Sequence, residues 1–345
     1  MQEKTFQRIP ALLLDWYRKN KRTLPWRQKP TPYEVWVSEI MLQQTRVEAV
    51  KEYYTRFIEA LPDVESLATC AEEKLLKLWE GLGYYSRVRN MQKTARILVS
   101  VYNGIFPHQV ETLTTLPGIG AYTAGAIASI AYGQRCSAVD GNVLRVVGRL
   151  LEKDSVISDT AYRKRVAEAL TAVYPKEGEA CAEFTQSLFE LGALICKPRT
   201  PDCSACPLSV ICQAYAHDTW WKYPVKAQKR EKRIEDVFVF LIQTPEGFCI
   251  RRREQGVLKG MNEFPSVVSD GSAPEETLYS WGITEYAWKQ KRNFTHIFTH
   301  IRWNITCLWI ESATAPFDAY ALEEIYEHVS LPTAFRKCLD ILENE

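Results

Sequence analysis

Two acidic residues stand in sequence contexts that could support acid–base chemistry. Glu39 lies among apolar residues in a stretch of helical character and shares a helix face with Trp36 and Gln43. A carboxyl group desolvated by such neighbours has a raised pKa and can hold a proton near neutral pH, whereas a solvated acid on the outer helix face fits the pattern as well. Asp140 lies in a short break before another apolar helix, where the helix N-terminus and Asn142 favour its ionised form. The pair could therefore carry opposite protonation states.

A glycine-rich turn precedes Asp140. The segment 116–121 (Leu-Pro-Gly-Ile-Gly-Ala) separates two stretches of helical character, and Gly118 and Gly120 permit a tight turn that can approach a ligand closely. A helix predicted over 122–131 would present its N-terminus to an anion such as a DNA phosphate. A plain turn between two helices explains the motif as well. The turn and Asp140 would lie at opposite ends of that helix, about 15–20 Å apart if it is regular.

Four of the ten cysteines are clustered. Their spacing is Cys196-x6-Cys203-x2-Cys206-x5-Cys212, so that four thiolates could close around one metal centre. The spacing alone does not decide between zinc and an iron–sulfur cluster. The remaining cysteines are scattered, which argues against a disulfide framework and is typical of small buried side chains.

Composition indicates an ordinary globular protein. The chain has 345 residues, 46% of them hydrophobic and 25% charged, and a net charge of +1. This balance gives no general nucleic-acid signature, although a local basic patch would suffice for binding. No apolar run approaches the roughly 20 residues of a membrane span, and the N-terminus does not resemble a secretory signal. We therefore expect a cytoplasmic, nucleoid-associated monomer with no membrane partner.

The periodicity predicts two domains of different class. Helical patterns dominate residues 1–216, whereas alternating strand patterns occur only after residue 234, over 234–242, 247–251 and 299–310, with a final helix over 332–342. A basic, proline-containing stretch at 217–233 has no clear periodicity and is predicted to be a linker. We thus expect an all-α domain followed by a smaller α+β domain at 234–345.

Over nearly its whole length the sequence resembles the MutY adenine DNA glycosylases, within the helix-hairpin-helix superfamily that includes endonuclease III. The resemblance is carried by Leu24-Pro-Trp-Arg, Glu39 with Gln43-Gln-Thr-Arg-Val, Gly81-Leu-Gly-Tyr-Tyr-Ser-Arg, the glycine-rich turn, Val139-Asp-Gly-Asn-Val and the cysteine loop at 196–212, which has Pro207 after its third cysteine. Leu258-Lys-Gly-Met-Asn-Glu-Phe-Pro and Phe298-Thr-His resemble the MutT (Nudix)-like domain of that family. The implied fold is a helix-hairpin-helix glycosylase domain with a structural [4Fe–4S] cluster, followed by a MutT-like domain.

The resemblance also implies roles for individual residues. The substrate would be double-stranded DNA with adenine opposite 8-oxoguanine or guanine. Glu39 would protonate adenine N7, and Asp140, supported by Tyr122, would stabilise the positive charge that grows on the deoxyribose. The DNA- and base-binding residues would be Trp26, Arg27, Gln44, Thr45, Tyr84, Gly118, Gly120, Asn142, Gln186, Phe298, Thr299 and His300. Among these, Gln44 and Tyr84 would insert into the duplex, and Arg27 and Gln186 would hold the base edge.

The sequence departs from related patterns at three points. Residues 260–285 lack the glutamate-rich helix that binds Mg²⁺ in catalytic MutT-type hydrolases, which predicts a recognition module without pyrophosphatase activity. Thr299 replaces the usual serine of the Phe-Ser-His motif and retains its hydroxyl. Tyr122 stands where bifunctional relatives carry a lysine nucleophile, which favours a monofunctional enzyme. Two alternatives stay open: a thymine or pyrimidine mismatch glycosylase of the same fold, and a non-catalytic DNA-binding module.

Overall fold

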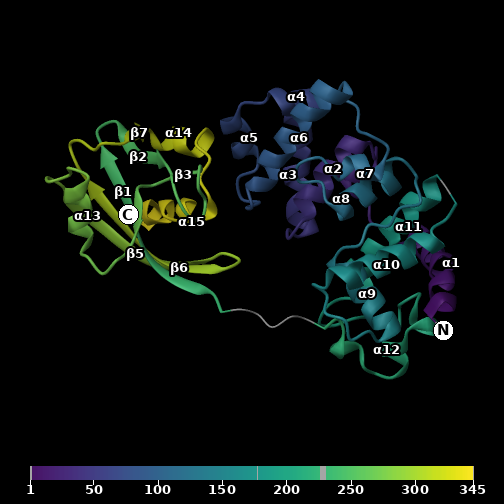
Figure 1. Ribbon diagram of the computed structural model, residues 1–345. Coiled ribbons are helices and arrows are strands. Elements are labelled where there is room, and N and C mark those ends of the chain that lie inside the picture. Colours follow the sequence, from purple (N-terminus) through teal and green to yellow (C-terminus); the bar gives the residue numbers. More distant parts are fainter. Residues whose placement is uncertain (1, 177, 226–230, 345) are drawn as a thin grey trace. The chain divides into compact units, whose positions relative to one another are not determined.

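A computed structural model describes residues 2–176, 178–225 and 231–344. Two compact units divide the chain: the first comprises residues 1–69 and 89–228, and the second comprises residues 70–88 and 229–345 (Figure 1). The sequence did not predict that residues 70–88 group with the C-terminal part of the chain. Residues 226–230 of the linker predicted at 217–233 lie outside the described residues.

The first unit is helical, as the sequence predicts. Outside its helices, the described residues of this unit contain one isolated β-bridge, between Val156 and Val225. Local signals mark where helices begin: Thr31 and Glu34 form a capping box before α2, and Pro32 takes the first helical position. The helices are α1 (Gln2–Asn20), α2 (Pro32–Leu42), α3 (Val47–Ala60), α4 (Val64–Thr69), most of α6 (Ser86–Tyr102), α7 (Val110–Leu113), α8 (Ala121–Ala126), α9 (Gly141–Leu151), α10 (Thr160–Val173), α11 (Glu179–Glu190) and α12 (Gln213–Ala216).

The glycine-rich turn is held by α6. Thr94 Oγ1 donates a hydrogen bond to the carbonyl of Pro117 at 2.8 Å, and Gly118 has a φ of +79°. A side chain at Gly118 would meet Asn90 Cβ at 2.9 Å, so glycine is required there by conformation and by space. The turn thus rests against a helix and leads into α8.

The chain after α8 doubles back instead of extending away. After α8 and the π-helical turn Ile127–Ala131, the chain returns alongside α8. A Cβ at Gly125 would lie 2.3 Å from the carbonyl oxygen of Ser137, so the two backbones are in direct contact. The chain thereby brings Asp140 to the cavity that Tyr122, near the start of α8, also lines.

The second unit contains a seven-stranded mixed sheet with the main order β3-β2-β1-β6-β5. Strand β1 pairs in parallel with β6 and antiparallel with β2. Alternate residues of β1 face opposite sides of the sheet, and each side has its own hydrophobic core. One core includes residues of α14 and α15, and the other includes Leu278 of α13 (Figure 1). The elements are α5 (Glu72–Leu78), β1 (Arg233–Thr244), β2 (Gly247–Arg252), β3 (Asn262–Glu263), β4 (Ser266–Val268), α13 (Pro274–Ser280), β5 (Ala287–Ile297), β6 (Ile301–Glu311), β7 (Asp318–Tyr320), α14 (Leu322–Glu327) and α15 (Thr333–Arg336).

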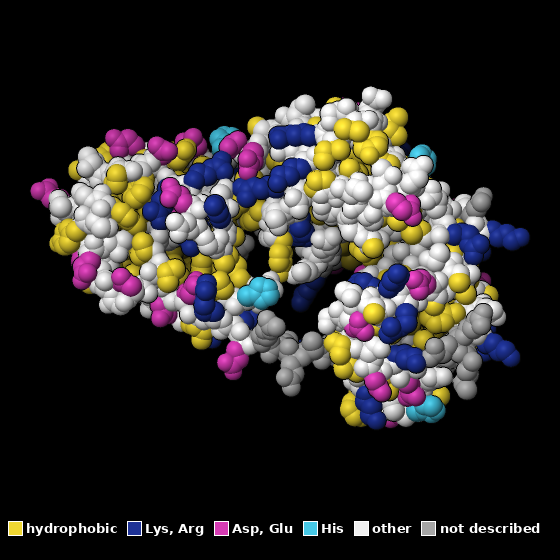
Figure 2. Space-filling view, in the orientation of Figure 1, with side chains coloured by type: hydrophobic (Ala, Val, Ile, Leu, Met, Phe, Trp, Pro, Cys, Tyr) yellow, Lys and Arg dark blue, Asp and Glu magenta, His cyan; other side chains and the backbone are white. Residues whose placement is uncertain are grey.

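Several predicted boundaries in this unit differ from the structure. Strand β5 was not predicted, and the strand predicted over 299–310 begins at Ile301, because residues 298–300 form the turn between β5 and β6. The final helix over 332–342 is broken into α15 and a 3₁₀ turn at Leu339–Asn344. Figure 2 shows Lys and Arg side chains interspersed with Asp and Glu side chains, in keeping with the net charge of +1.

Candidate active site

A cavity of about 170 Å³ in the first unit is lined by eight of the fifteen predicted catalytic and DNA-binding residues. Its walls come from the 3₁₀ turn Pro25–Arg27, α2, the turn after α2, α8, the start of α9, and α11. The predicted residues that line it are Trp26, Arg27, Glu39, Thr45, Tyr122, Asp140, Asn142 and Gln186. Both candidate carboxylates, which are distant in the sequence, thus line one cavity.

Glu39 is a buried acid and not a solvated one. Its side chain lies on the inner face of α2 with 5% relative exposure. Burial raises its pKa from 4.5 to about 7, although a hydrogen bond from the Tyr122 hydroxyl to Oε2 opposes the shift, and the nearby Asp140 carboxylate raises the pKa further. Near neutral pH, Glu39 is therefore divided between its protonated and ionised forms.

Asp140 accepts a hydrogen bond at each carboxylate oxygen. It is the N-cap residue of α9, where Oδ1 accepts a hydrogen bond from the backbone N–H of Val143 at 2.8 Å. Oδ2 accepts a second hydrogen bond from Asn142 Nδ2 at 2.6 Å. Both oxygens thus face donors, and the helix N-terminus adds favourable partial positive charge.

Tyr122 contacts Glu39 directly. Its hydroxyl donates to the Glu39 carboxylate, whereas the resemblance implied support of Asp140. Burial, followed by the charges of Glu39 and Asp140, raises the pKa of this phenol well above 10.0, so that it stays a donor. Its ring lies 5.8 Å from that of Phe189, which closes one side of the cavity.

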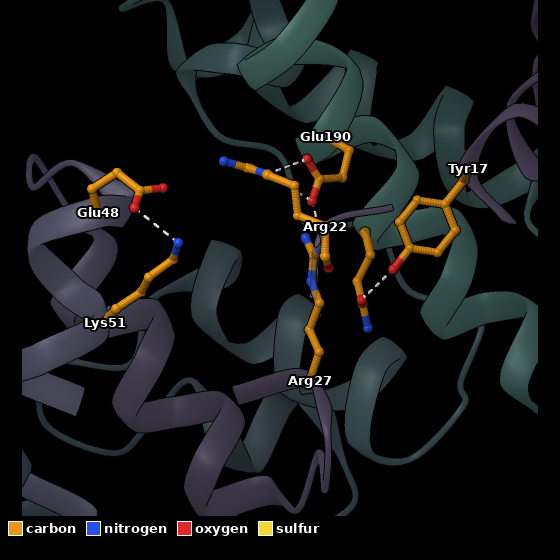
Figure 3. Close-up of polar contacts among 7 residues, drawn as sticks. Tyr17, Arg22, Arg27, Glu48, Lys51 and Glu190 are labelled. Carbon is orange, nitrogen blue, oxygen red and sulfur yellow. Dashed lines mark hydrogen bonds and ion pairs between the residues drawn. The ribbon is translucent and has the colours of Figure 1, made fainter. Parts of the chain in front are cut away.

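A buried ion cluster positions Arg27. Glu190, at the end of α11, is fully buried and accepts hydrogen bonds from Arg27 Nη1 and from Arg22 Nε, the latter at 2.9 Å. Figure 3 shows both guanidinium groups directed at this carboxylate. Neither Glu190 nor Arg22 was predicted from the sequence, because the two residues are 168 positions apart in the chain. A buried acid facing two arginines holds Arg27 at the cavity wall.

Gln186 is oriented by Tyr17. The Tyr17 hydroxyl donates to Gln186 Oε1 at 2.6 Å, which leaves the amide NH₂ group of Gln186 as a donor. Burial raises the pKa of Tyr17 to about 12. The guanidinium of Arg27 lies 5.9 Å from the centre of the same ring. Tyr17, which was not predicted, therefore contacts both residues that were expected to hold the base edge.

The remaining predicted DNA-binding residues lie outside this cavity. Gln44 is exposed in the turn after α2 with a φ of +64°, an unusual conformation for a non-glycine residue. Gly118 and Gly120 are exposed at the glycine-rich turn. In the second unit, Tyr84 is 47% exposed with a φ of +48°, and its hydroxyl lies 2.9 Å from Thr299 Oγ1 in a hydrogen bond.

The turn between β5 and β6 presents the other predicted recognition residues. The ring of Phe298 packs edge-on against Trp303 with 4.8 Å between centroids. Thr299 and His300 are exposed. Phe298 therefore anchors the turn in the core, and the two following side chains point outward.

The four clustered cysteines surround a second, apolar cavity. Burial is the main cause that raises the pKa of Cys206 to about 12 and of Cys212 to about 11, and the neighbouring thiolates add to it. Arg149 Nη1 donates to Cys196 Sγ at 3.4 Å. Within the described residues no group of three or more side chains could hold a single metal ion, and the thiols ring a cavity instead. Four sulfurs around an apolar space fit a multi-atom cluster, whose iron would favour the thiolate forms.

Comparisons with known proteins assign the family. Residues 37–172 match the HhH-GPD superfamily of base excision DNA repair proteins, and residues 238–340 match the NUDIX domain. An adenine DNA glycosylase of Buchnera aphidicola is 34% identical over 310 residues, which cover 86% of this chain and 84% of that protein. The chain belongs to the adenine DNA glycosylase family. The human adenine DNA glycosylase is 31% identical over 404 residues, which cover 96% of this chain and 73% of the human protein.

Solved structures agree with this membership at the level of fold. A thermostable thymine-DNA glycosylase superposes with a TM-score of 0.56 at 27% identity, covering 62% of this chain and 98% of that one. Endonuclease III in a non-covalent DNA complex superposes with a TM-score of 0.52 at 26% identity, covering 62% and 97% respectively. Membership of the adenine DNA glycosylase family makes the protein a base-excision N-glycosylase that releases adenine from DNA. The predictions of a glycosylase and of a helix-hairpin-helix domain followed by a MutT (Nudix)-like domain are thereby confirmed, and the non-catalytic alternative is wrong. Among the described residues, no helix is both long and apolar enough to cross a membrane.

Proposed function

We propose that the protein removes adenine opposite 8-oxoguanine or guanine by acid-assisted hydrolysis of the N-glycosidic bond, without a lyase step. The observation that carries this proposal is the cavity that Glu39 and Asp140 both line, one buried with a raised pKa and the other bonded to two donors. When their environments keep one carboxyl group protonated and the other ionised, the first can act as an acid and the second can stabilise positive charge.

Glu39 acts as the general acid. A flipped adenine enters the cavity at a cost of a few kcal/mol for unstacking. The protonated carboxyl of Glu39 gives its proton to adenine N7, so that the base departs as a neutral group. Tyr122 fixes the Glu39 carboxyl through its hydrogen bond. Because Tyr122 carries no amine, no Schiff base forms at this position; water adds to the anomeric carbon in place of the base, and the enzyme leaves an abasic site.

Asp140 stabilises the sugar. As the glycosidic bond breaks, positive charge develops on the deoxyribose, and an ionised carboxylate offsets it electrostatically or through a transient bond. The hydrogen bonds from Val143 and Asn142 hold Asp140 before the substrate arrives. This preorganisation means that no rearrangement of the carboxylate is needed during the reaction.

The cavity wall recognises the base edge. The amide NH₂ of Gln186 and the guanidinium of Arg27 are donors suited to the ring nitrogens of a purine. Trp26 and Thr45 complete the wall, and Gln44 would fill the gap left by the flipped base. Gly118 and Gly120 would bring backbone amides to a phosphate.

The second unit would read the opposite base. Tyr84 and Thr299 are exposed and hydrogen-bonded to each other, and His300 is exposed beside them in sequence. An exposed tyrosine with a strained backbone suits insertion between bases. Thr299 retains the hydroxyl that would distinguish 8-oxoguanine from guanine. This unit would act in recognition, without pyrophosphatase activity.

Cys196, Cys203, Cys206 and Cys212 would hold a [4Fe–4S] cluster. The four thiols ring one apolar cavity, and Arg149 bonds to Cys196 and to the backbone of the same loop. Such a cluster would be structural, since it would tie the loop 196–212 to α9. Iron and sulfide analysis of the purified protein, with visible absorption, tests the assignment against zinc.

A panel of end-labelled duplexes tests the function. Duplexes carrying A·8-oxoG, A·G and T·G pairs are incubated with the protein, and strand breaks are scored before and after alkali. We expect alkali-dependent breaks at adenine in the first two duplexes, and Glu39→Gln to slow them by about a hundredfold or more. Breaks without alkali, or release of thymine instead of adenine, would contradict the proposal.

A further inference from the structure

Helix α5 is joined to the C-terminal part of the second unit by reciprocal capping. The Lys77 ammonium donates to the carbonyls of Val329 at 3.0 Å and Ile325 at 3.4 Å, near the C-terminal end of α14. In return, the buried Ser330 hydroxyl donates to the carbonyl of Leu76 at 3.1 Å, in the last turn of α5. Lys77 of α5 thus satisfies carbonyls near the C-terminal end of α14. Ser330, which follows α14, satisfies a carbonyl near the C-terminal end of α5.

An ion triad reinforces the same junction. Lys77 Nζ lies 2.8 Å from Glu80 Oε2, and Arg336 Nη1 donates to Glu80 Oε1 at 2.7 Å. The Glu80 and Lys77 side chains are only 13% and 21% exposed. Charge pairs that are largely shielded from water hold their geometry better than exposed ones. We call Lys77, Glu80, Ser330 and Arg336 the α5 mount.

The Tyr84 turn is built rigidly on the α5 mount. Trp79 Nε1 donates to the carbonyl of Gly83 at 3.1 Å, and Arg87 Nη2 donates to the same carbonyl at 3.2 Å. The Arg87 guanidinium lies 5.4 Å from the ring centres of both Trp79 and Tyr84. These contacts restrain the short segment between Glu80 and Tyr84, so the position of the α5 mount determines the position of the Tyr84 ring.

The hydrogen bond between Tyr84 and Thr299 cannot provide that positioning. Both side chains are exposed, so water competes for their hydroxyls and the net gain from one such bond is modest. The contacts of the mount, which include the buried Ser330 and the largely shielded pair of Lys77 and Glu80, join the same two parts of the chain, residues 70–88 and 229–345. They are the stronger restraint on the distance between Tyr84 and Thr299.

We propose that the α5 mount is a specificity device, which holds the inserting Tyr84 turn against the Thr299 turn and so sets the preference for 8-oxoguanine over guanine opposite adenine. The inference rests on the proposed function, in which these two turns read the opposite base. Its residues are positioning residues, since none of them needs to touch DNA. A mount that merely stabilises the fold would leave the preference unchanged.

The test compares Lys77→Met and Arg336→Met with a charge-matched control. Lys289→Met also removes one positive charge, from an exposed pair between Lys289 of β5 and Glu311 of β6. Adenine excision is measured under single-turnover conditions on A·8-oxoG and A·G duplexes. We expect the ratio of the two rates to fall about five- to tenfold in both mount variants and to stay unchanged in Lys289→Met.

Hydrogen exchange supplies a readout independent of activity. Backbone amides of residues 80–88 should exchange faster in the mount variants and at the wild-type rate in Lys289→Met. If Lys77→Met does not fold, Arg336→Met and Ser330→Ala decide the question. A wild-type rate ratio near one refutes the proposed role of the second unit in reading the opposite base, whereas a clear wild-type preference that the mount variants retain refutes this inference alone.

Discussion

Replacement of Tyr122 by phenylalanine should move the pH dependence of adenine release upward. The Tyr122 hydroxyl donates to the Glu39 carboxylate, and this bond lowers the pKa that burial raises to about 7. A hydrogen bond to a charged group contributes about 1.5–3 kcal/mol, and 1.36 kcal/mol corresponds to one pKa unit. Loss of the bond should therefore raise the pKa of Glu39 by about one to two units.

The direction in which the pH profile shifts depends on which protonation state of Glu39 is active. The acid works when protonated, so the wild-type rate should fall as the pH rises through about 7. In Tyr122→Phe the same falling limb should lie about one to two units higher, whatever happens to the plateau rate. Single-turnover excision from an A·8-oxoG duplex, measured between about pH 5 and 9, locates the limb.

Tyr17→Phe is the matched control for this experiment. It also removes a phenol hydroxyl, but this hydroxyl donates to Gln186, a cavity residue, and not to Glu39. Its falling limb should coincide with that of the wild type, while substrate affinity drops. A limb in Tyr122→Phe that stays in place or moves to lower pH, or an equal shift in Tyr17→Phe, would refute the assignment of Glu39 as the acid.

Three further outcomes are expected. The pKa of Glu39 is higher in the folded state than its usual 4.5, so its ionisation lowers the stability of the fold as the pH rises from about 4.5 to 7. Glu39→Gln should therefore be more stable than the wild type by up to about 3 kcal/mol at pH 8, and about equally stable near pH 4.5. Urea unfolding measures both differences. Glu190→Gln should destabilise the protein by about 3 kcal/mol, because two arginines lose a buried partner. Glu48→Gln, in the exposed pair with Lys51 (Figure 3), should change the stability little. Equal effects of the two substitutions would show that burial of the charge is irrelevant. Cys206→Ser should lose iron and visible absorption and melt at a lower temperature, and retention of full iron content would exclude Cys206 as a ligand.

The two acids that line the cavity could be selected from the sequence, whereas the residues that position its walls could not. Glu39 and Asp140 could be selected because each stands in a local pattern, an apolar helix or a helix start, that a reader can recognise. Glu190 could not be recognised in the same way, since its role depends on hydrogen bonds from Arg22 and Arg27, which lie more than 160 residues away in sequence. Partners at such separation leave no periodic signal.

Topology was predicted only where local patterns determine it. The helical first unit and the strands β1 and β2 followed from periodicity. Strand β5 was missed because its charged residues, such as Lys289 and Lys291, hide the alternation expected of a half-buried strand, although lysines are common on sheet edges. The grouping of residues 70–88 with the second unit depends on side chains that cap helices elsewhere in the chain, and helical periodicity carries no information on such pairings.

Gly125 shows how a residue that touches neither acid can govern the distance between them. The backbone of the Asp140 segment passes so close to α8 that a single methyl group would overlap the Ser137 carbonyl. Any larger residue would push that segment outward and carry the carboxylate with it. Substitution at Gly125 should therefore impair the enzyme although this position carries no functional group, because the Ser137 carbonyl already occupies the space that a side chain would need.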